Sequence, residues 1–394
     1  MDSVAHQLAR WAVELEPTPE DHQLAARALT DTVAVTVAAR KHPIRRIADG
    51  LPDATRWATV AHVLDFDDLH MESTTHVSVV CVPAVLAAGG GARAYLAAAG
   101  VMARLGMALG WPHYSAGWHA TCTAGAPAAA AGAGTALGLS ATQIATAMAL
   151  AIPAAGGLQR AFGTDGKSLQ VGFAVEAGVR AARLAAAGAT ADTDAVGQWL
   201  ELVGGNPGAI DPGGPAVPGG LGIKLFPCCY ALQRPISTLA ELAGQVDPTD
   251  VTRIVLRTPQ STVVPLVHHQ PATGLEGKFS LEYAAATALL DRHQGLNSFT
   301  DEAVRRPEAQ RLGNLVDVQL TQGGTGLLDG ELEAEIHANG EVLAGRTQYP
   351  PGSPKRPPTG TQLTSKVNDC LTGTGLDPQS IDWSSAGEIL RCYT

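Results

Sequence analysis

The sequence predicts a mainly α protein, in which a large all-helical domain is followed by a smaller α+β domain. The chain has 394 residues, more than one small domain requires. Its hydrophobic fraction of 45% is dominated by Ala, Val and Leu, and side chains of this size allow helices to pack closely. A Gly/Pro-rich linker over residues 204–220 separates the helical part from strand-like sequences.

These observations predict two domains. We predict that residues 1–218 form the helical domain and that residues 219–357 form the α+β domain. Residues 358–394 follow a Pro-rich stretch and contain a final helical segment. We expect this segment to return to the helical domain.

Two helix starts in the first domain have clear capping signals. Thr18 can cap a helix that begins at Pro19, and the two acidic residues that follow favour its first turn. Ser140 and Gln143 form a capping-box pattern ahead of apolar residues at helical spacing. Both sites therefore predict the beginning of a helix.

A long segment of the first domain has no charged residue, since no Asp, Glu, Lys or Arg occurs between Arg104 and Arg160. Such a segment could indicate a membrane hairpin. However, Ala, Gly, Thr, Ser and Gln are weak membrane formers compared with Leu, Ile and Phe. We therefore predict helices buried on all sides in a globular protein, and no membrane segment.

Strand patterns follow the linker. TRIVLRT and VDVQLTQ alternate β-branched residues, and ELEAEIHANGEVLAG is typical of a hairpin with Asn339–Gly340 at its turn. KFSLEYAAATALLDRH, between them, is typical of a helix. The second domain is therefore predicted to be α+β.

Charge and cysteine content limit the partners and the compartment. The net charge of −10 and the pI of about 5.6 argue against a nucleic-acid or anionic-membrane partner. An anionic substrate would need a local cluster of cationic residues. The six cysteines show no CxxC spacing, and charges interleave with apolar residues at the N-terminus, unlike a signal peptide. We expect a reduced, cytoplasmic protein.

Titratable residues gather between two apolar runs in VLDFDDLHMESTTHVSVV, residues 63–80. By residue type alone, these could bind a metal: Asp65, Asp67, Asp68, His70, Glu72 and His76. Their spacing matches no zinc or EF-hand pattern. Either the acids are solvated caps of a helix that begins near His76, or one or two carboxylates turn inward. Because VVCVPAVLAA is apolar enough to be buried, His76 would lie inside, where Asp65 could orient it.

Two further segments carry candidate residues. His119 introduces the charge-free helical region, where it is either a packed core residue or a functional one, and Thr121 could cap the helix or donate a hydrogen bond. Lys167 lies at the mouth of a helix, whose N–H groups and dipole favour a carboxylate or phosphate. A solvated lysine is the alternative. The surrounding glycines do not form a nucleotide-binding loop.

Lys224 precedes a helix that we expect to start at Pro227, with Cys228 and Cys229 in its first turn. A helix N-terminus can lower the pKa of a cysteine. No general base is near them in sequence, so nucleophilic catalysis has little support.

Lys278 and Tyr283 lie in the segment KFSLEY. The spacing of Lys278 and Glu282 is that of an ordinary pair on a helix surface, while Tyr283 falls among apolar positions and is expected to point inward. Taken together, the candidates are His, Lys, Tyr and buried Asp, without a zinc signature or a Ser–His–Asp elbow. Such a set suits binding of a small polycarboxylate and proton transfer at a carbon beside it.

Five segments resemble, in this order, the signature blocks of the MmgE/PrpD family: DFDDLHMESTTHVSVVCVPA, AGWHATCTAGAPAAAAGAGTALGLS, FGTDGKSLQVGFAVEAGVRAARLA, IKLFPCCYALQRPI and GKFSLEYAAATALL. The match runs from about residue 22 to the C-terminal region. The family includes 2-methylcitrate dehydratase, cis-aconitate decarboxylase and iminodisuccinate epimerase. The resemblance implies an all-helical domain, an α+β lid and a homodimer.

The resemblance also implies roles for individual residues. The catalytic residues would be Asp65, His76, His119 and Tyr283, and the substrate would be bound by Lys167, Lys224, Cys229 and Thr121. No cofactor and no metal are implied. The chain departs from the family at Gln233, where a Thr-His pair usually follows the PCC block, and at Cys229, where the decarboxylase has a histidine.

The expected activity is that of a metal-independent MmgE/PrpD-type lyase, acting by proton transfer at a carbon beside a carboxylate of a small di- or tricarboxylate. Dehydration of a 2-methylcitrate-like substrate is the first candidate, by analogy with the family. Epimerisation or decarboxylation of an iminodisuccinate- or aconitate-like substrate is the alternative. A non-catalytic metabolite-binding protein is the alternative of another class, motivated by Gln233. The sequence leaves open the substrate, the stereochemistry and the roles of Cys228 and Cys229.

Overall fold

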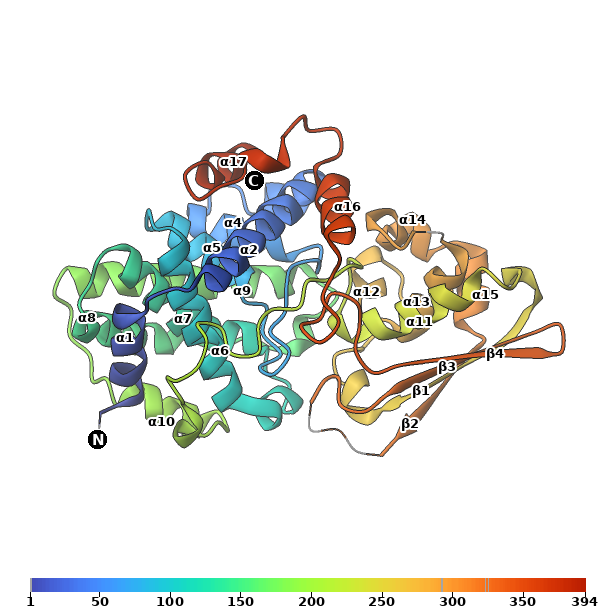
Figure 1. The fold of residues 1–394 in the computed structure, drawn as a ribbon, viewed down its shortest axis with the longest axis horizontal. Coiled ribbons are helices and arrows are strands. Elements are labelled where there is room, and N and C mark those ends of the chain that lie inside the picture. Colours follow the sequence, from blue (N-terminus) through green and yellow to red (C-terminus); the bar gives the residue numbers. More distant parts are fainter. Residues whose placement is uncertain (1, 292, 323, 325) are drawn as a thin grey trace.

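A helical domain and a smaller domain around a four-stranded sheet make up the structure, a computed structural model (Figure 1). The structure describes residues 2–291, 293–322, 324 and 326–394. The predicted fold class, mainly α with a small α+β part, is confirmed.

The elements divide into three groups along the chain. Before the linker lie α1 (Val4–Glu14), α2 (Pro19–Ala38), α3 (Ile44–Ile47), α4 (Asp53–His62), α5 (Ser78–Ala87), α6 (Ala92–Ser115), α7 (Ala120–Ala136), α8 (Ala141–Ala151), α9 (Asp165–Ala186) and α10 (Ala195–Leu202). After it lie α11 (Gln233–Ala243), β1 (Val251–Pro259), α12 (Gly274–Gly277), α13 (Leu281–Leu290), α14 (Asp301–Val304), α15 (Pro307–Gly313), β2 (Val316–Thr321), β3 (Leu332–Ala338) and β4 (Glu341–Thr347). The C-terminal helices are α16 (Gly360–Leu371) and α17 (Ala386–Tyr393).

Both predicted helix starts are confirmed. At the start of α2, the Thr18 hydroxyl accepts the N–H of Asp21 at 3.2 Å and the Asp21 carboxylate accepts the N–H of Thr18 at 3.0 Å. Ser140 and Gln143 form the same reciprocal pair at the start of α8. These bonds satisfy N–H groups that have no partner within the helix.

The charge-free segment forms the end of α6, all of α7 and α8, and α7 is buried along nearly its whole length. Gly178 on α9 permits the close approach of α9 to α7, because a Cβ atom there would lie 2.6 Å from the carbonyl oxygen of Ala126. The prediction of helices buried on all sides is therefore confirmed for α7, whereas α8 buries only the face that carries Ile144 and Met148 and leaves Thr142 exposed.

Within the described part of the chain, α6 is the one helix long and apolar enough to span a membrane by length and composition. Its most apolar window is 83% buried inside the protein, and Gly110, at φ 65°, kinks it. The guanidinium of Arg104 in its middle donates to carbonyl oxygens of the linker, among them Gly213 at 2.9 Å and Ala216 at 3.0 Å. These are properties of a helix in the core of a folded domain. A cytoplasmic location stays a prediction.

The sheet of the small domain has the strand order β2-β1-β3-β4, with β1 parallel to β2 and antiparallel to β3. The predicted hairpin of β3 and β4 is confirmed, and Asn339 (φ 53°) and Gly340 (φ 77°) form its turn. α11 packs on β3 and β4, and the helices α11 to α15 lie on one side of the sheet (Figure 1).

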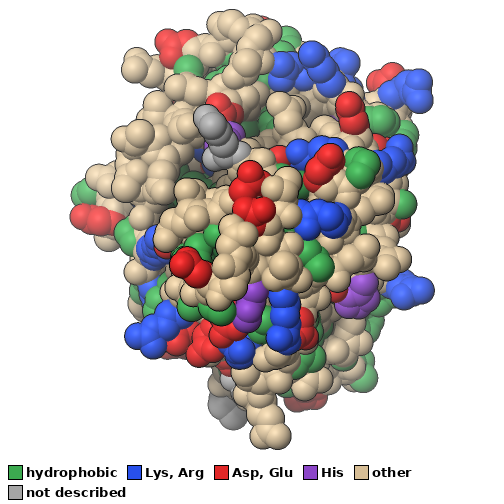
Figure 2. Space-filling model, turned by 90° about the vertical axis from the view of Figure 1, so that its right-hand side faces the viewer, with side chains coloured by type: hydrophobic (Ala, Val, Ile, Leu, Met, Phe, Trp, Pro, Cys, Tyr) green, Lys and Arg blue, Asp and Glu red, His purple; other side chains and the backbone are tan. Residues whose placement is uncertain are grey.

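Acidic and basic side chains lie interspersed on the end of the molecule formed by the small domain (Figure 2). On the sheet, Arg257 of β1 lies 2.6 Å from Glu335 of β3, and Arg253 lies 2.5 Å from Asp317 of β2. Because water reaches these pairs, each contributes little to the free energy of unfolding.

The two domains have separate hydrophobic cores. The larger core takes residues from Val4 to Val217 and again from Cys370 to Leu390, while the second takes most of its residues from 228–338. The C-terminal helices α16 and α17 both pack on α2. We therefore propose that residues 1–218 with 358–394 form one domain and 219–357 the other. The separate cores support this division.

One helix begins later than predicted. The sequence placed Cys228 and Cys229 in the first turn of a helix, but α11 begins only at Gln233, after one 3₁₀ turn. The reason is a tertiary contact, because the N–H of Cys229 donates to the carbonyl oxygen of Lys278 at 3.0 Å. The predicted helix start was therefore wrong, and these thiols do not lie at a helix N-terminus.

A buried ion pair attaches the C-terminal segment to the helical domain. The Lys366 ammonium of α16 lies 2.6 Å from the Asp31 carboxylate of α2 and donates to the carbonyl oxygen of Phe66 at 2.8 Å. Both side chains are almost inaccessible to water. Removing one partner would leave the other charge buried and uncompensated.

We therefore expect Lys366→Met to lower the free energy of unfolding by about 3 kcal/mol. Urea denaturation followed by tryptophan fluorescence measures the change. Lys355→Met, at an exposed lysine, is the control and should change it by less than about 0.5 kcal/mol. Equal losses in the two variants would contradict the importance of the buried pair.

Candidate functional site

Titratable side chains from both domains meet where the two domains join. We define this buried cluster as His62, Asp65, Asp67, His76, His119, Lys167, Lys224 and Lys278. Each member is at most 8% exposed. The helical domain provides the first six residues, and the small domain provides the last two. A cluster of unlike charges in a dry interior is typical of a functional site.

The turn after α4 sets the direction of the aspartates. α4 ends at His62, and Asp65 adopts a positive φ of 51°, which Asp tolerates better than most residues. Asp65 and Asp67 contact the cluster, whereas Asp68 accepts the N–H of Ser78 at 3.0 Å and so caps α5. Burial raises the pKa of Asp68 to about 7. The interpretation that carboxylates turn inward describes Asp65 and Asp67. Asp68 does accept an N–H at the start of α5, but it is buried, whereas the capping interpretation had expected a solvated acid.

Asp67 lies between two histidines. Its Oδ2 is 2.9 Å from Nδ1 of His62 and 2.9 Å from Nδ1 of His76. Burial acts to raise the pKa of Asp67, but the two histidines overcome this effect and hold the pKa well below its usual value. The hydrogen bond between Asp67 and His62 places the proton of that ring on Nδ1. Nδ1 of His76 makes no hydrogen bond with Asp67 at its 2.9 Å distance, but the nearby negative charge of Asp67 favours a proton there and leaves Nε2 as the basic nitrogen. Sequence reasoning named Asp65 as the orienter of His76, but Asp65 Oδ1 lies 3.7 Å from the other nitrogen, Nε2.

Asp65 binds two ammonium groups with one oxygen. Its Oδ1 accepts from Lys167 Nζ at 2.9 Å and from Lys224 Nζ at 3.0 Å. Burial alone would raise the pKa of Asp65, yet the two lysines and His76 hold it far below its ordinary value. Burial also acts to lower the pKa of Lys224, and the nearby aspartates reverse this, so that the pKa is raised. Asp65 and Lys224 therefore keep each other ionised.

His119 occupies the N-cap position of α7, at the predicted helix start. Its ring stacks on that of His62, with 5.7 Å between the centroids. Burial, followed by Lys167, holds the pKa of His119 well below its usual value, so the ring is neutral. Within the described part of the chain, its Nε2 has no hydrogen-bond partner. A buried polar nitrogen without a partner is costly, and a bound ligand would remove that cost.

The sequence predicted that Lys278 lies on a helix surface, but the structure buries it. It precedes α13 and is 3% exposed, and its Nζ donates to the carbonyl oxygen of Pro227 at 2.5 Å. Burial lowers its pKa to about 8. The predicted pair with Glu282 is wrong, because Glu282 lies 2.8 Å from Nδ1 of His269 instead.

The cluster therefore carries a local excess of positive charge. Three lysines face two ionised aspartates, and burial keeps the histidines neutral, with the pKa of His76 lowered to about 4. This excess is maintained in a protein whose net charge is −10. Because charges interact more strongly in a dry interior than in water, the arrangement favours an anionic ligand.

Two other predicted residues lie beside the cluster. Thr121 Oγ1 accepts the backbone N–H of His76 at 3.0 Å and so holds that residue in place. The Cys229 thiol is buried near Asp65 and Lys224, and burial raises its pKa to about 12, which keeps it protonated.

Tyr283, by contrast, is not brought to the cluster. Its hydroxyl donates to the carbonyl oxygen of Ser298, and its ring packs edge-on against Phe299. The structure thus brings together Asp65, His76, His119, Lys167 and Lys224 of the predicted residues, and places Tyr283 elsewhere.

Gln233 also lies outside the cluster and has a structural contact. Its Oε1 accepts the N–H groups of Leu225 and Phe226 at 3.2 and 3.1 Å, and its Nε2 donates to the carbonyl oxygen of Phe226 at 2.9 Å. These bonds hold the segment that follows Lys224.

Four cluster residues could hold a metal ion by donor type. Donor atoms of His62, Asp65, Asp67 and His76 lie within 4.8 Å of one another. However, Lys167 Nζ lies 2.6 Å from Nε2 of His62 and shares Asp65 Oδ1 with Lys224. Two ammonium groups thus contact this donor set, and a divalent cation would have to displace them against their charge. The residues fit a metal poorly.

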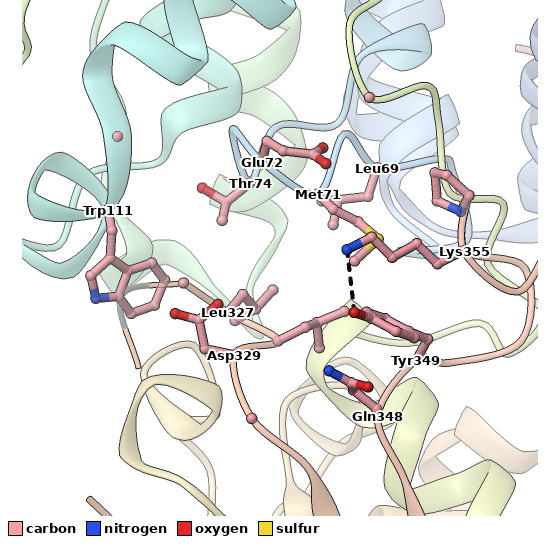
Figure 3. Close-up of a pocket in the computed structure, with 16 residues that line it drawn as sticks. Leu69, Met71, Glu72, Thr74, Trp111, Leu327, Asp329, Gln348, Tyr349 and Lys355 are labelled. Carbon is pink, nitrogen blue, oxygen red and sulfur yellow. Dashed lines mark hydrogen bonds between the residues drawn. The ribbon is translucent and has the colours of Figure 1, made fainter. Parts of the chain in front are cut away.

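A cavity of about 490 Å³ lies between the two domains (Figure 3). Leu69 and Thr74 line it from the loop that leads to His76, and Trp111 lines it from α6. The small domain lines it with residues 326–330, 348–349 and 354–355. No cluster member is among its lining residues. The cavity is therefore not part of the site.

The fold and the site define a class: a helical domain joined to an α+β domain, with a buried acid–base cluster between them. The chain matches the MmgE/PrpD N-terminal domain over residues 53–199 and the MmgE/PrpD C-terminal domain over residues 226–381. The protein belongs to the MmgE/PrpD family, which confirms the resemblance of the five sequence blocks. A search of curated proteins found no match. The family contains lyases and related enzymes, so membership supports an enzyme in general terms.

Sequence reasoning missed His62 and named Asp67 and Lys278 without assigning them to the catalytic or binding residues. His62 is the last buried residue of α4. A histidine at the apolar spacing of a helix is a sequence signal, but a weak one. Asp67 stands two residues after Asp65, and only its contacts distinguish it from Asp68. Lys278 was assigned to a helix surface because its burial depends on the tertiary contact with Pro227.

The two charged neighbours of His76 should shift its titration in opposite directions. In ¹⁵N-histidine NMR, we expect the wild-type ring to titrate near pH 4. Asp67→Asn removes a negative charge and should lower the pKa of His76, whereas Lys224→Met removes a positive charge and should raise it. The buried His113, which binds Val203, is the internal control and should not shift. Shifts of the same sign in both variants would contradict this geometry.

Proposed function

We propose that the protein is a metal-independent lyase that transfers a proton at a carbon beside a carboxylate of a small di- or tricarboxylate. Dehydration of a 2-methylcitrate-like substrate is the first candidate. Membership of the MmgE/PrpD family supports lyase-type chemistry. The observation that carries the proposal is an excess of buried positive charge beside a neutral histidine.

The lysines account for binding of an anionic substrate. Lys167 and Lys224 both direct their ammonium groups to one oxygen of Asp65, and a substrate carboxylate can become an additional partner of the same groups. Lys278 adds a third positive charge. Because desolvated charges are costly without partners, a carboxylate ligand would be favoured over a neutral one.

His76 is the proposed base. Its Nε2 is the basic nitrogen, because Asp67 lies 2.9 Å from Nδ1. A carbon acid beside a carboxylate is very weak, so the negative charge that develops on the substrate must be stabilised in a dry site. Lys167 and Lys224 provide that stabilisation.

The dehydration can be completed with one base. The proton passes from the substrate carbon to His76, the electron pair of the broken C–H bond forms the double bond, and the hydroxyl leaves the neighbouring carbon. The same proton then leaves with that hydroxyl as water. This route needs no second acid, in keeping with the bond between the Tyr283 hydroxyl and Ser298.

Epimerisation of an iminodisuccinate-like substrate is the second candidate. It requires a proton donor for the opposite face of the carbon, and the protonated thiol of Cys229, near Asp65 and Lys224, could serve. Decarboxylation of an aconitate-like substrate would use the same lysines. A metabolite-binding protein without activity would bind the same anions but exchange no proton. We further propose a cytoplasmic homodimer, on the resemblance alone.

Proton NMR in deuterated water tests the proposal. The panel is citrate, 2-methylcitrate, cis-aconitate and iminodisuccinate, each with and without EDTA. We expect deuterium incorporation or turnover of at least one compound, unaffected by EDTA and reduced at least about 100-fold in His76→Gln. His269→Gln, at an exposed histidine in the small domain, is the control and should retain activity. Loss of activity in EDTA would sink the metal-independent mechanism, and binding without exchange would favour the non-catalytic alternative.

The pH dependence should have two limbs. Below pH 4, His76 gains a proton and can no longer act as a base, so kcat/KM should fall tenfold per pH unit. Above pH 8, Lys278 loses its charge and the substrate binds less tightly. Lys278→Met should remove the alkaline limb and leave the acid limb in place. A Lys278→Met profile with an unchanged alkaline limb would exclude this lysine as its cause.

A further inference from the structure

Gln170, one turn after Lys167 on α9, contacts the cluster through a single histidine. Its side-chain nitrogen Nε2 lies 2.6 Å from Nδ1 of His119. Residues three apart on a helix share a face, so Lys167 and Gln170 approach the cluster together. Neither the family match nor the proposed function assigns a role to Gln170.

The orientation of the Gln170 amide is fixed by the backbone of Leu158. The Leu158 N–H donates to Oε1 of Gln170 at 3.1 Å, and Nε2 of Gln170 donates to the Leu158 carbonyl oxygen at 3.3 Å. Exchanging the two ends of the amide would place donor against donor and acceptor against acceptor. The NH₂ group must therefore be the end that faces His119.

This orientation determines the tautomer of His119. Because an NH₂ group donates and cannot accept, Nδ1 of His119 is the acceptor. Cys122 Sγ lies 3.2 Å from the same nitrogen, and burial raises the pKa of Cys122, so its thiol keeps a proton and can donate to Nδ1 as well. The proton of the neutral ring is therefore on Nε2, the nitrogen that has no partner among the described residues.

We propose that Gln170 is a positioning residue that fixes His119 as a neutral Nε2–H donor to an oxygen of the substrate. His119 then binds this oxygen through a hydrogen bond and does not act as a base. The role in binding rests on the proposed function, whereas the tautomer does not. This nitrogen selects a ligand with an oxygen acceptor, either a carboxylate or a hydroxyl group. A ligand that placed an apolar group there would leave the buried N–H without a hydrogen bond, which costs free energy.

The first test is the tautomer itself, read from the two-bond and three-bond ¹H–¹⁵N correlations of ¹⁵N-histidine-labelled protein. His119→Gln assigns the signal. We expect a proton on Nε2 and none on Nδ1 in the wild type. A proton on Nδ1 would overturn the proposal, whether or not any substrate is turned over.

Gln170→Glu is the decisive variant, because it keeps the shape and places a carboxylate where the NH₂ group was. An ionised carboxylate can only accept a hydrogen bond, so we expect Nδ1 of His119 to carry a proton, in either the opposite tautomer or a doubly protonated ring. Gln170→Met removes the donor without adding a charge. It guards against failure of the first variant to fold, and it should weaken the preference for Nε2–H without protonating both nitrogens. Gln143→Glu, at an exposed capping residue of α8, makes the same charge change elsewhere and should leave His119 unaltered.

Activity separates the two parts of the proposal. On any compound of the panel that the wild type turns over, Gln170→Glu should reduce kcat/KM at least about tenfold, with the loss depending on pH as the ring of His119 titrates. If the tautomer changes while kcat/KM stays the same, the donor role of His119 is wrong although the proposed function stands. If no compound is turned over but the wild-type tautomer is as expected, the proposed function fails and the positioning by Gln170 stands.

Discussion

The site depends on one shared oxygen, Oδ1 of Asp65, which binds Lys167 at 2.9 Å and Lys224 at 3.0 Å. Lys167 comes from α9 of the helical domain and Lys224 from the small domain, so this oxygen is also an electrostatic link between the two. Neither ammonium group could remain charged in a dry interior without a nearby carboxylate. The positive φ of Asp65 places the carboxylate there, at a conformational cost on the order of 1 kcal/mol.

A second lysine contact lies directly beside this link. The residue after Asp65 offers its carbonyl oxygen to the Lys366 ammonium, which also pairs with Asp31. Two successive residues of one turn of the helical domain therefore bind the small domain, through Lys224, and the C-terminal segment, through Lys366. A disturbance of that turn would reach all three parts, and conversely the three parts together hold the strained conformation in place.

Local features could be predicted from sequence, and long-range ones could not. The capping boxes at Thr18 and Ser140 and the turn at Asn339 depend on residues within a few positions of each other, and they were found. The burial of Lys278 depends on the carbonyl oxygen of a residue 51 positions away, and no local pattern contains that information.

The same distinction applies within the candidate site. Family blocks supplied the residue types, because each block is local in sequence. The sequence predicted that Asp65 orients His76, but Asp67 is the carboxylate that lies next to Nδ1 of His76. The path of the turn decides which of the two aspartates takes this position, and the local sequence does not reveal it. The sequence did not single out Gln170, because the orientation of its amide is set by hydrogen bonds to the backbone of Leu158, 12 residues away.

The close approach of α7 and α9 has a consequence for how this enzyme could be diversified. At Gly178, even one added methyl group would collide with the backbone of α7, so the helical wall that carries Lys167 tolerates little variation. The small domain contributes Lys224 and Lys278 from segments outside any helix, so the close contact between α7 and α9 does not limit the side chains there. New substrate preferences, whether selected in nature or in a laboratory library, should therefore arise from substitutions in the small domain.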